Sequence, residues 1–244
     1  MKPFVLIATR PEDVTADGEY EAFLRYGNLR ERDLRRVRLE AGPLPEFDLD
    51  EISGVILGGS PFTSSIPSAE KSALQRRVEA ELSRLMDAVV ADDIPLLGAC
   101  YGVGTLGVHQ GAIIDSTYAE ELGAPLLRVT DAGRSDPLLV GIPDEFRSFV
   151  GHKEACAKLP DHATLLVTAD ACPVQMFKIK QNLYGTQFHP ELDVPGIHVR
   201  IETYKEHGYF PADTAEEVKA YTASFDVSSS HRVVANFTEY YGRR

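Results

Sequence analysis

The sequence predicts a three-layer α/β sandwich with a mostly parallel central sheet. Short, almost entirely apolar runs at residues 4–8, 54–57 and 94–100 have the pattern of strands that are buried on both faces. A long stretch at 68–91 has apolar residues every three or four positions, as an amphipathic helix does. Alternation of such strands and helices is typical of a parallel sheet with right-handed crossovers and helices on both faces.

The other predicted elements complete this architecture. We expect a helix at 17–30 and a strand at 34–39 before the first break rich in glycine and proline. Further along, short β-like runs predict antiparallel strands added to the same domain, at 125–129, 147–150, 164–168, 174–179 and 184–188. The C-terminal part predicts helices at 195–207, 213–224 and 231–241. Because no repeat and no linker-like composition divides the chain, we expect a single domain over residues 1–244.

Composition argues against several classes of protein. The chain has 244 residues, of which 43% are hydrophobic and 25% charged, and its net charge is −12. This acidic balance argues against nucleic acid as a partner, because phosphate-backbone binding requires clustered Lys and Arg. The apolar runs are much shorter than the roughly 20 residues that span a bilayer, so no membrane partner is expected. Three cysteines cannot form a disulfide framework, and the N-terminus lacks signal-peptide features, so we expect a cytoplasmic protein.

A cysteine ends the strand-like run 94–100 and lies in a glycine-flanked turn. Gly98-Ala99-Cys100-Tyr101-Gly102 has the pattern of a nucleophile elbow, a tight strand-to-helix turn that exposes a nucleophile above the sheet. The helix predicted to begin at Tyr101 would place partial positive charge near the sulfur. A lone cysteine after a strand is more often an inert core residue, so the two flanking glycines are what favour Cys100 as a nucleophile.

A thiol nucleophile needs a base, and the segment after the last β-like run supplies a candidate. Gln187-Phe188-His189-Pro190-Glu191 would place His189 at the carboxyl edge of the sheet, where the active sites of open α/β sheets gather. The Glu191 carboxylate, two positions further on, is close enough to hydrogen-bond one imidazole nitrogen and fix the tautomer. We therefore predict a catalytic triad of Cys100, His189 and Glu191.

Acyl transfer also requires donors for the negative charge that develops on the carbonyl oxygen. The loop Gly58-Gly59-Ser60 follows the strand at 54–57 and allows close backbone approach, so the Gly59 amide is one predicted oxyanion donor. The amide of Tyr101, directly after the nucleophile, is the other. Without the elbow, the glycine loop would be interpreted as an ordinary turn.

Taken in this order, the three segments resemble the class I glutamine amidotransferases, and the elbow is especially similar to that of the glutaminase domain of GMP synthetases. The resemblance extends over about residues 50–192 and includes Val150-Gly151-His152-Lys153-Glu154, where the family binds the amino-acid part of glutamine through backbone groups. It implies a flavodoxin-like fold and a Cys-His-Glu triad, with neither an organic cofactor nor a metal ion required. The implied substrate contacts are Gly58, Ser60, Gly104, Gly151 and His152.

One departure from the family pattern concerns the substrate. The family usually has Gln four positions after the nucleophile, where its side chain helps to hold glutamine, whereas this chain has Gly104. We hypothesise that a bulkier γ-glutamyl compound uses the room that Gly104 leaves. The chain also lacks the phosphate-binding loop of an ATP pyrophosphatase domain, so a role in synthesis would need a partner subunit that receives ammonia.

Three functions remain open from the sequence. The first is a glutaminase that hydrolyses glutamine through a thioester and passes ammonia to a synthase subunit. The second is a stand-alone γ-glutamyl hydrolase or peptidase that acts on a larger small-molecule substrate. The third is a non-catalytic binding module on the same fold, which the intact triad argues against.

The remaining cysteines lack a motif. Cys156 and Cys172 are 16 positions apart, with His152 and His162 near them, and this spacing matches no common zinc pattern. We expect structural thiols rather than metal ligands.

Overall fold

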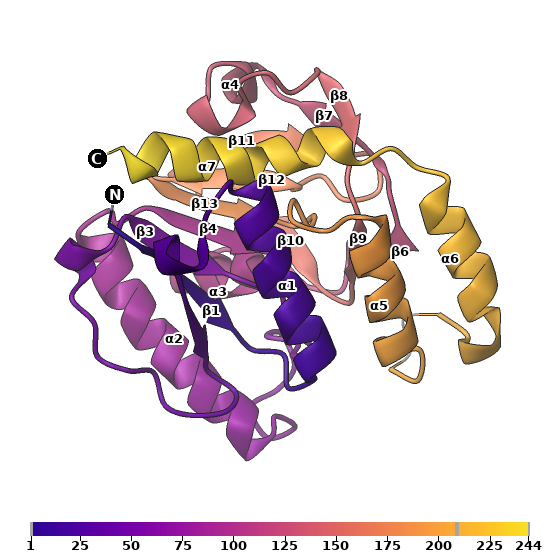
Figure 1. The fold of residues 1–244 in the computed structure, drawn as a ribbon, viewed down its shortest axis with the longest axis horizontal. Helices are drawn as coiled ribbons and strands as arrows, with labels where there is room; N and C mark the ends of the chain where they lie inside the picture. Colours follow the sequence, from indigo (N-terminus) through magenta and orange to yellow (C-terminus); the bar gives the residue numbers. More distant parts are fainter. Residues whose placement is uncertain (1, 208–209, 244) are drawn as a thin grey trace.

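The centre of the computed structural model is a mixed sheet, nine-stranded within the described residues 2–207 and 210–243, with helices on both faces (Figure 1). The strand order is β2-β1-β3-β4-β13-β12-β11-β7-β8. From β2 to β13 in that order, neighbouring strands are parallel. This is the order of a flavodoxin-like sheet, and it confirms the predicted fold class.

The parallel half of the sheet consists of β1 (Phe4–Ala8), β2 (Leu34–Arg38), β3 (Gly54–Leu57), β4 (Leu96–Ala99) and β13 (Leu183–Thr186). Every residue of β1, β3, β4 and β13 is buried, which explains their nearly continuous apolar sequence. β2 is the edge strand, and its three arginines are partly or fully exposed, whereas Leu34 and Val37 are buried.

The antiparallel half consists of β12 (Met176–Ile179), β11 (Ala163–Thr168), β7 (Leu126–Val129) and β8 (Glu145–Arg147). Two small sheets lie outside it and pair β5 (Ile113–Asp115) with β10 (Ala155–Lys158), and β6 (Glu120–Gly123) with β9 (Val150–His152). The strand predicted at 147–150 is thus divided between β8 and β9. The inclusion of 184–188 in the antiparallel set is wrong in part, because β13 is antiparallel to β12 but parallel to β4.

The helices are α1 (Asp13–Tyr26), α2 (Ala73–Ala91), α3 (Tyr101–His109), α4 (Asp131–Arg134), α5 (Val194–Tyr204), α6 (Ala215–Ala223) and α7 (Arg232–Gly242). Short 3-10 turns lie at Glu31–Asp33, Leu49–Glu51, Pro137–Leu139, Ala212–Thr214 and Ser228–His231. α2 begins later than predicted because the Ser72 side chain, not that of Ser68, accepts a hydrogen bond from the Gln75 amide and caps the helix. Within the described part of the chain, no helix has the length and apolar character needed to cross a membrane.

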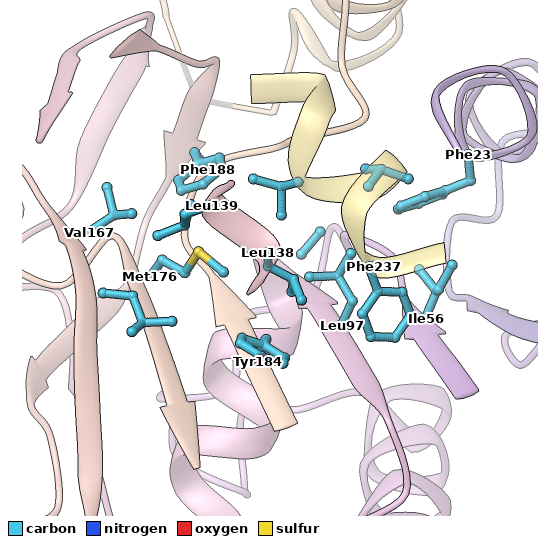
Figure 2. Packing of buried hydrophobic residues seen from close by; sticks show 14 of the residues in the cluster. Phe23, Ile56, Leu97, Leu138, Leu139, Val167, Met176, Tyr184, Phe188 and Phe237 are labelled. Atoms are coloured by element: carbon cyan, nitrogen blue, oxygen red, sulfur yellow. The ribbon is translucent and has the colours of Figure 1, made fainter. Parts of the chain in front are cut away.

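Apolar side chains on the two faces of the sheet form separate clusters, since successive residues of a strand point to opposite faces. Phe4, Leu6 and Ile56 pack with residues of α1 and α7 on one face, and Figure 2 shows Phe23 and Phe237 meeting this layer. Val5, Ile7 and the other alternate residues pack against α2 and α3 on the opposite face. These two layers of helices and the sheet between them form the three-layer sandwich.

α5 and α6 lie beside the small sheet of β6 and β9 rather than over either face of the central sheet (Figure 1). Their apolar residues form a third cluster with Phe149 and Leu192, to which α5 contributes Ile197 and Ile201. α5 also packs against α1. These helices therefore enclose one side of the carboxyl edge of the parallel strands.

Truncation of Phe237 tests the packing of α7. Phe237 is fully buried and its ring centroid lies 5.6 Å from that of Phe4, so Phe237→Ala should lower the free energy of unfolding by about 3–5 kcal/mol. Tyr240→Ala, which removes a side chain 42% exposed on the same helix, should lower it by less than about 1 kcal/mol. Urea denaturation of both variants measures the difference, and equal losses would show that α7 is not part of the core.

Candidate active site

The carboxyl ends of the parallel strands bring the predicted triad together. Cys100 follows β4 and His189 follows β13, and the two strands are in parallel register with Ala99 opposite Thr186. Cys100 and His189 both line a cavity of about 50 Å³ at this edge of the sheet. Arg10, which follows β1, and Ser60, which follows β3, line the same cavity. The site therefore lies where open parallel sheets usually bind their ligands.

The turn at Cys100 is strained in the manner of a nucleophile elbow. Cys100 has φ 53° and ψ −86°, which non-glycine residues rarely adopt. Its amide donates to the Thr186 carbonyl oxygen at 2.7 Å, which ties the turn to β13. A Cβ atom at Gly98 would lie 2.8 Å from the Cα of Gly102. The flanking glycines therefore let α3 start directly above its strand.

The first turn of α3 lies directly beside the nucleophile. Tyr101 is the first residue of the helix, so its amide has no acceptor further along the helix ladder. The positive end of the helix dipole is therefore close to Cys100. The role of the Tyr101 amide as the second oxyanion donor stays a prediction.

His189 is fixed through both its backbone and its side chain. Its amide donates to the Phe149 carbonyl oxygen at 2.9 Å, and its carbonyl accepts from the Ser148 hydroxyl at 3.2 Å. Its Nδ1 lies 2.8 Å from Oε1 of the fully buried Glu191. Glu191 thus makes the contact that orients an imidazole, as the sequence predicts.

A buried cluster of charged and polar residues that sequence analysis missed surrounds the triad. Arg200 Nη2 donates to Glu191 Oε1 at 2.8 Å, and Arg200 Nη1 lies 3.0 Å from His189 Nδ1. Arg10 Nε donates to Glu19 Oε1 at 3.2 Å, and Arg200 Nη2 lies 3.4 Å from the same oxygen. The two ion pairs therefore meet at Glu19 and support the His–Glu pair from behind.

Only one member of this cluster had a usable signal in the sequence. Arg10 stands two positions after the strand-like run 4–8, at the sheet edge where functional groups gather. Glu19 on α1 and Arg200 on α5 meet it through tertiary packing. Neither has a local pattern that marks it.

The predicted oxyanion loop makes contacts that compete with its assigned role. The Gly59 amide donates to Glu19 Oε1 at 3.1 Å, and the Gly58 amide donates to the Ile7 carbonyl oxygen at 3.0 Å. Neither glycine lines the cavities beside Cys100, whereas Ser60 lines both. Gly59 can therefore serve as an oxyanion donor only if its hydrogen bond to Glu19 breaks. The role of Gly59 as an oxyanion donor and that of Gly58 as a substrate contact stay predictions.

A second cavity, of about 30 Å³, lies on the other side of Cys100 and contains the remaining predicted substrate contacts, Gly104, Gly151 and His152. A Cβ atom at Gly104 would lie 2.3 Å from the Ser64 hydroxyl oxygen. Ser64 is held by Glu154, whose carboxylate accepts from the Ser64 amide at 2.7 Å. The hypothesis that Gly104 leaves room for a bulkier substrate is therefore wrong, because Ser64 fills that space.

Burial decides the protonation of the triad at rest. It raises the pKa of the Cys100 thiol to about 12, although Arg10 and Arg200 act in the opposite direction. Burial also lowers the pKa of His189 to about 4, with Glu191 opposing this shift and Arg200 adding to it. Burial therefore favours the thiol over the thiolate at Cys100 and the neutral imidazole over the imidazolium at His189.

Three side chains outside the triad have the donor types of a metal site. One atom each of Glu120, His152 and Cys172 lies within 4.8 Å of the others. His152 Nε2 is 2.9 Å from Glu120 Oε2, and its Nδ1 is 3.0 Å from the Glu154 carbonyl oxygen. Both ring nitrogens thus lie beside oxygen atoms of the fold itself. Sequence spacing missed this cluster because β6, β9 and the β11–β12 loop each supply one residue.

Fold and site together define an α/β protein with a candidate cysteine-centred site at the carboxyl edge of a parallel sheet. The sequence model of the family "Glutamine amidotransferase class-I" matches residues 21–195. This match covers well over half of the chain, so the protein belongs to that family and the resemblance drawn from its sequence is confirmed.

Curated relatives include GMP synthases. The glutamine-hydrolyzing GMP synthase of Streptomyces avermitilis is 30% identical over 176 residues, which cover 69% of this chain and 30% of the relative. One subunit of the glutamine-hydrolyzing GMP synthase of Methanocaldococcus jannaschii is 28% identical over 152 residues, which cover 62% of this chain and 71% of that protein. The chain thus matches less than a third of the length of the first relative.

Solved structures share the fold. A glutamine amidotransferase from Thermotoga maritima has a TM-score of 0.72 and 23% identity, with 98% of this chain and 99% of that chain covered. One from Methylobacillus flagellatus also has a TM-score of 0.72, with 17% identity over 98% of this chain and 95% of that one.

The protonation state of Cys100 can be tested by alkylation. Because its thiol has a pKa of about 12, the rate of labelling by iodoacetamide should rise about tenfold per pH unit between pH 7 and 10. Peptide mass spectrometry measures the rate, with the fully buried Cys156 and Cys172 as slower internal controls. A rate that is already constant below pH 7 would instead indicate a preformed thiolate–imidazolium pair.

Removal of Arg200 tests whether the buried charges depend on one another. Arg200→Met leaves Glu191 and Glu19 without one of their cations, so the free energy of unfolding should fall by about 3–5 kcal/mol. The matched control is Arg25→Met, which removes an arginine whose side chain is 62% exposed and paired with Asp193, and which should cost less than about 1 kcal/mol. Urea denaturation compares the two, and a loss at Arg200 no larger than at Arg25 contradicts this view of the cluster.

Proposed function

We propose that this protein hydrolyses γ-glutamyl amide bonds with Cys100 as the nucleophile, and that with glutamine as substrate it releases ammonia for a partner synthase. The observation that supports this most strongly is that the strained Cys100 turn and His189 line one cavity, and that His189 is hydrogen-bonded to Glu191 behind it. Membership of the glutamine amidotransferase class-I family supports the same chemistry.

In the proposed acylation step, Cys100 Sγ attacks the γ-carbonyl carbon as its proton passes to the free nitrogen of His189. The oxyanion is stabilised by the Tyr101 amide and, once released from Glu19, by the Gly59 amide. His189 then gives its proton to the leaving nitrogen, the C–N bond breaks, and a γ-glutamyl thioester with Cys100 remains. Glu191 holds the imidazole orientation and stabilises the imidazolium that forms.

Deacylation follows the same route with water in place of the thiol. His189 accepts a proton from water as its oxygen attacks the thioester carbonyl carbon. The C–S bond then breaks, the proton returns to Cys100 Sγ, and glutamate leaves. Burial favours the neutral form of His189, which is the form that accepts a proton at the start of both steps.

A partner synthase is supported by the relatives. The Methanocaldococcus jannaschii protein is by its name one subunit of a glutamine-hydrolyzing GMP synthase. A stand-alone γ-glutamyl hydrolase is the second candidate. The enclosure of one side of the site by α5 and neighbouring apolar residues favours that candidate.

Ammonia release from glutamine, measured with the purified chain, tests the proposal. Cys100→Ala should lower the turnover number by about a thousandfold or more, because the acyl intermediate cannot form. Cys172→Ala removes a buried thiol outside both cavities and should keep most of the activity. Equal turnover by the Cys100→Ala variant and the unmodified protein would exclude Cys100 as the nucleophile.

A further inference from the structure

The two cavities beside Cys100 have different walls. The smaller one includes apolar residues such as Phe62 and Val103, but also Lys153, Glu154 and Gln187, so it offers charged and amide groups suited to an amino-acid head. The larger one contains His189 and is walled mainly by apolar side chains, which are Leu122, Val150, Leu192, Ile197, Ile201 and Phe210. Cys100 lines both, so a bond held at its sulfur lies between a polar and an apolar compartment.

The position of His189 decides which part of a substrate each compartment receives. In amide hydrolysis the imidazole donates its proton to the leaving nitrogen, so the leaving group must lie on the imidazole side of the scissile bond. His189 lines the larger cavity and is absent from the lining of the smaller one. The acyl part therefore belongs in the polar compartment and the amine part in the apolar one.

The lining of the larger cavity also restricts the charge of the amine part. Among the described residues that line it, Arg10 and Arg200 are the charged side chains, and none is Asp or Glu. A second ammonium group on the leaving amine would face two guanidinium groups without a carboxylate of the cavity wall to pair with. The apolar walls likewise offer nothing to ammonia, which has no apolar surface to bury.

Four of the six apolar wall residues belong to a helix or to paired strands. Ile197 and Ile201 are four residues apart on α5, so they share one helix face, and both are 1% exposed. Leu122 comes from β6 and Val150 from β9, which pair with each other.

At about 10–15 Å³ for each water-sized group, a cavity of about 50 Å³ holds about three to five heavy atoms.

We propose that the larger cavity binds the amine part of the substrate and that this part is a short, neutral alkyl group. The substrate class is an N-alkyl γ-glutamyl amide with about two to four carbons on nitrogen. This range follows from about 10–15 Å³ for each water-sized group, because the amide nitrogen is one of the about three to five heavy atoms that the cavity holds. Water cleaves it to glutamate and a primary alkylamine, with one C–N bond broken and one C–O bond formed. This inference rests on the proposed γ-glutamyl amide hydrolysis and names its leaving group.

The specificity constant kcat/KM for a homologous series tests the cavity directly. The series is glutamine and the γ-glutamyl methyl-, ethyl-, propyl- and butylamides, and kcat/KM should rise about fourfold for each methylene group until the cavity is full. The γ-glutamyl amide of 1,3-diaminopropane adds an ammonium group to the propyl chain. Its kcat/KM should be lower than that of the propylamide by about tenfold or more. Preference for this cationic amide, or for γ-glutamylalanine with its carboxylate, overturns the proposal.

A charge placed at the rim of the cavity supplies a second test. Leu122→Asp should raise kcat/KM for the cationic amide relative to the propylamide by about tenfold, because the new carboxylate pairs with the ammonium group. The matched control is Leu126→Asp, since Leu126 is 38% exposed on β7 and outside the cavity, and it should leave this ratio unchanged. An unchanged ratio in a folded Leu122→Asp variant contradicts the assignment of the cavity.

Binding to the Cys100→Ala variant separates this inference from the proposed function, because it needs no turnover. Calorimetry should show that the propylamide binds more tightly than glutamine. Across the series, the binding constant should increase by about the same factor per methylene group as kcat/KM does. If kcat/KM and the affinity for glutamine equal those for every alkylamide, the proposed alkyl specificity of the larger cavity is wrong, although the proposed hydrolase activity stands. If the binding series holds but no Cys100-dependent turnover occurs, the cavity stands and the hydrolase is wrong.

Discussion

Four charged groups removed from water hold this site in place. Arg10 and Arg200 pair with Glu19 and Glu191, and a buried charge is tolerated only when such partners compensate for its lost hydration. The pairs join the end of β1, helix α1, helix α5 and the segment after β13. Displacement of any of these elements would leave a charge without its partner, so the cluster holds the segment that carries His189 and Glu191 against elements far apart in the sequence.

The same cluster sets the electrostatic character of the site. Burial is the largest cause of both pKa shifts in the triad, because it raises the pKa of Cys100 and lowers that of His189. Arg10 and Arg200 oppose the rise at Cys100. In our account, Cys100 becomes a nucleophile only when a bound acyl group gives the transferred proton a route to His189 and onward to the leaving nitrogen.

Sequence analysis anticipated the features that depend on local pattern. The elbow glycines around Cys100 and the short spacing from His189 to Glu191 are visible in the sequence because adjacent residues form each contact. The buried strands are visible because burial on both faces requires continuous apolar runs. Arg200 was invisible because its contacts depend on where α5 packs. The filled space at Gly104 was equally hidden, because the residue that fills it is Ser64, 40 positions earlier in the chain.

The central claim is that Cys100 forms a γ-glutamyl thioester. Acid quenching of the protein during turnover of glutamine or a γ-glutamyl alkylamide, followed by peptide mass spectrometry, tests it most directly. Our account predicts a γ-glutamyl adduct on the peptide that contains Cys100, formed at the rate of the first turnover and lost when substrate is exhausted. Turnover with no adduct on Cys100 at any time, while an adduct forms elsewhere, would contradict the account.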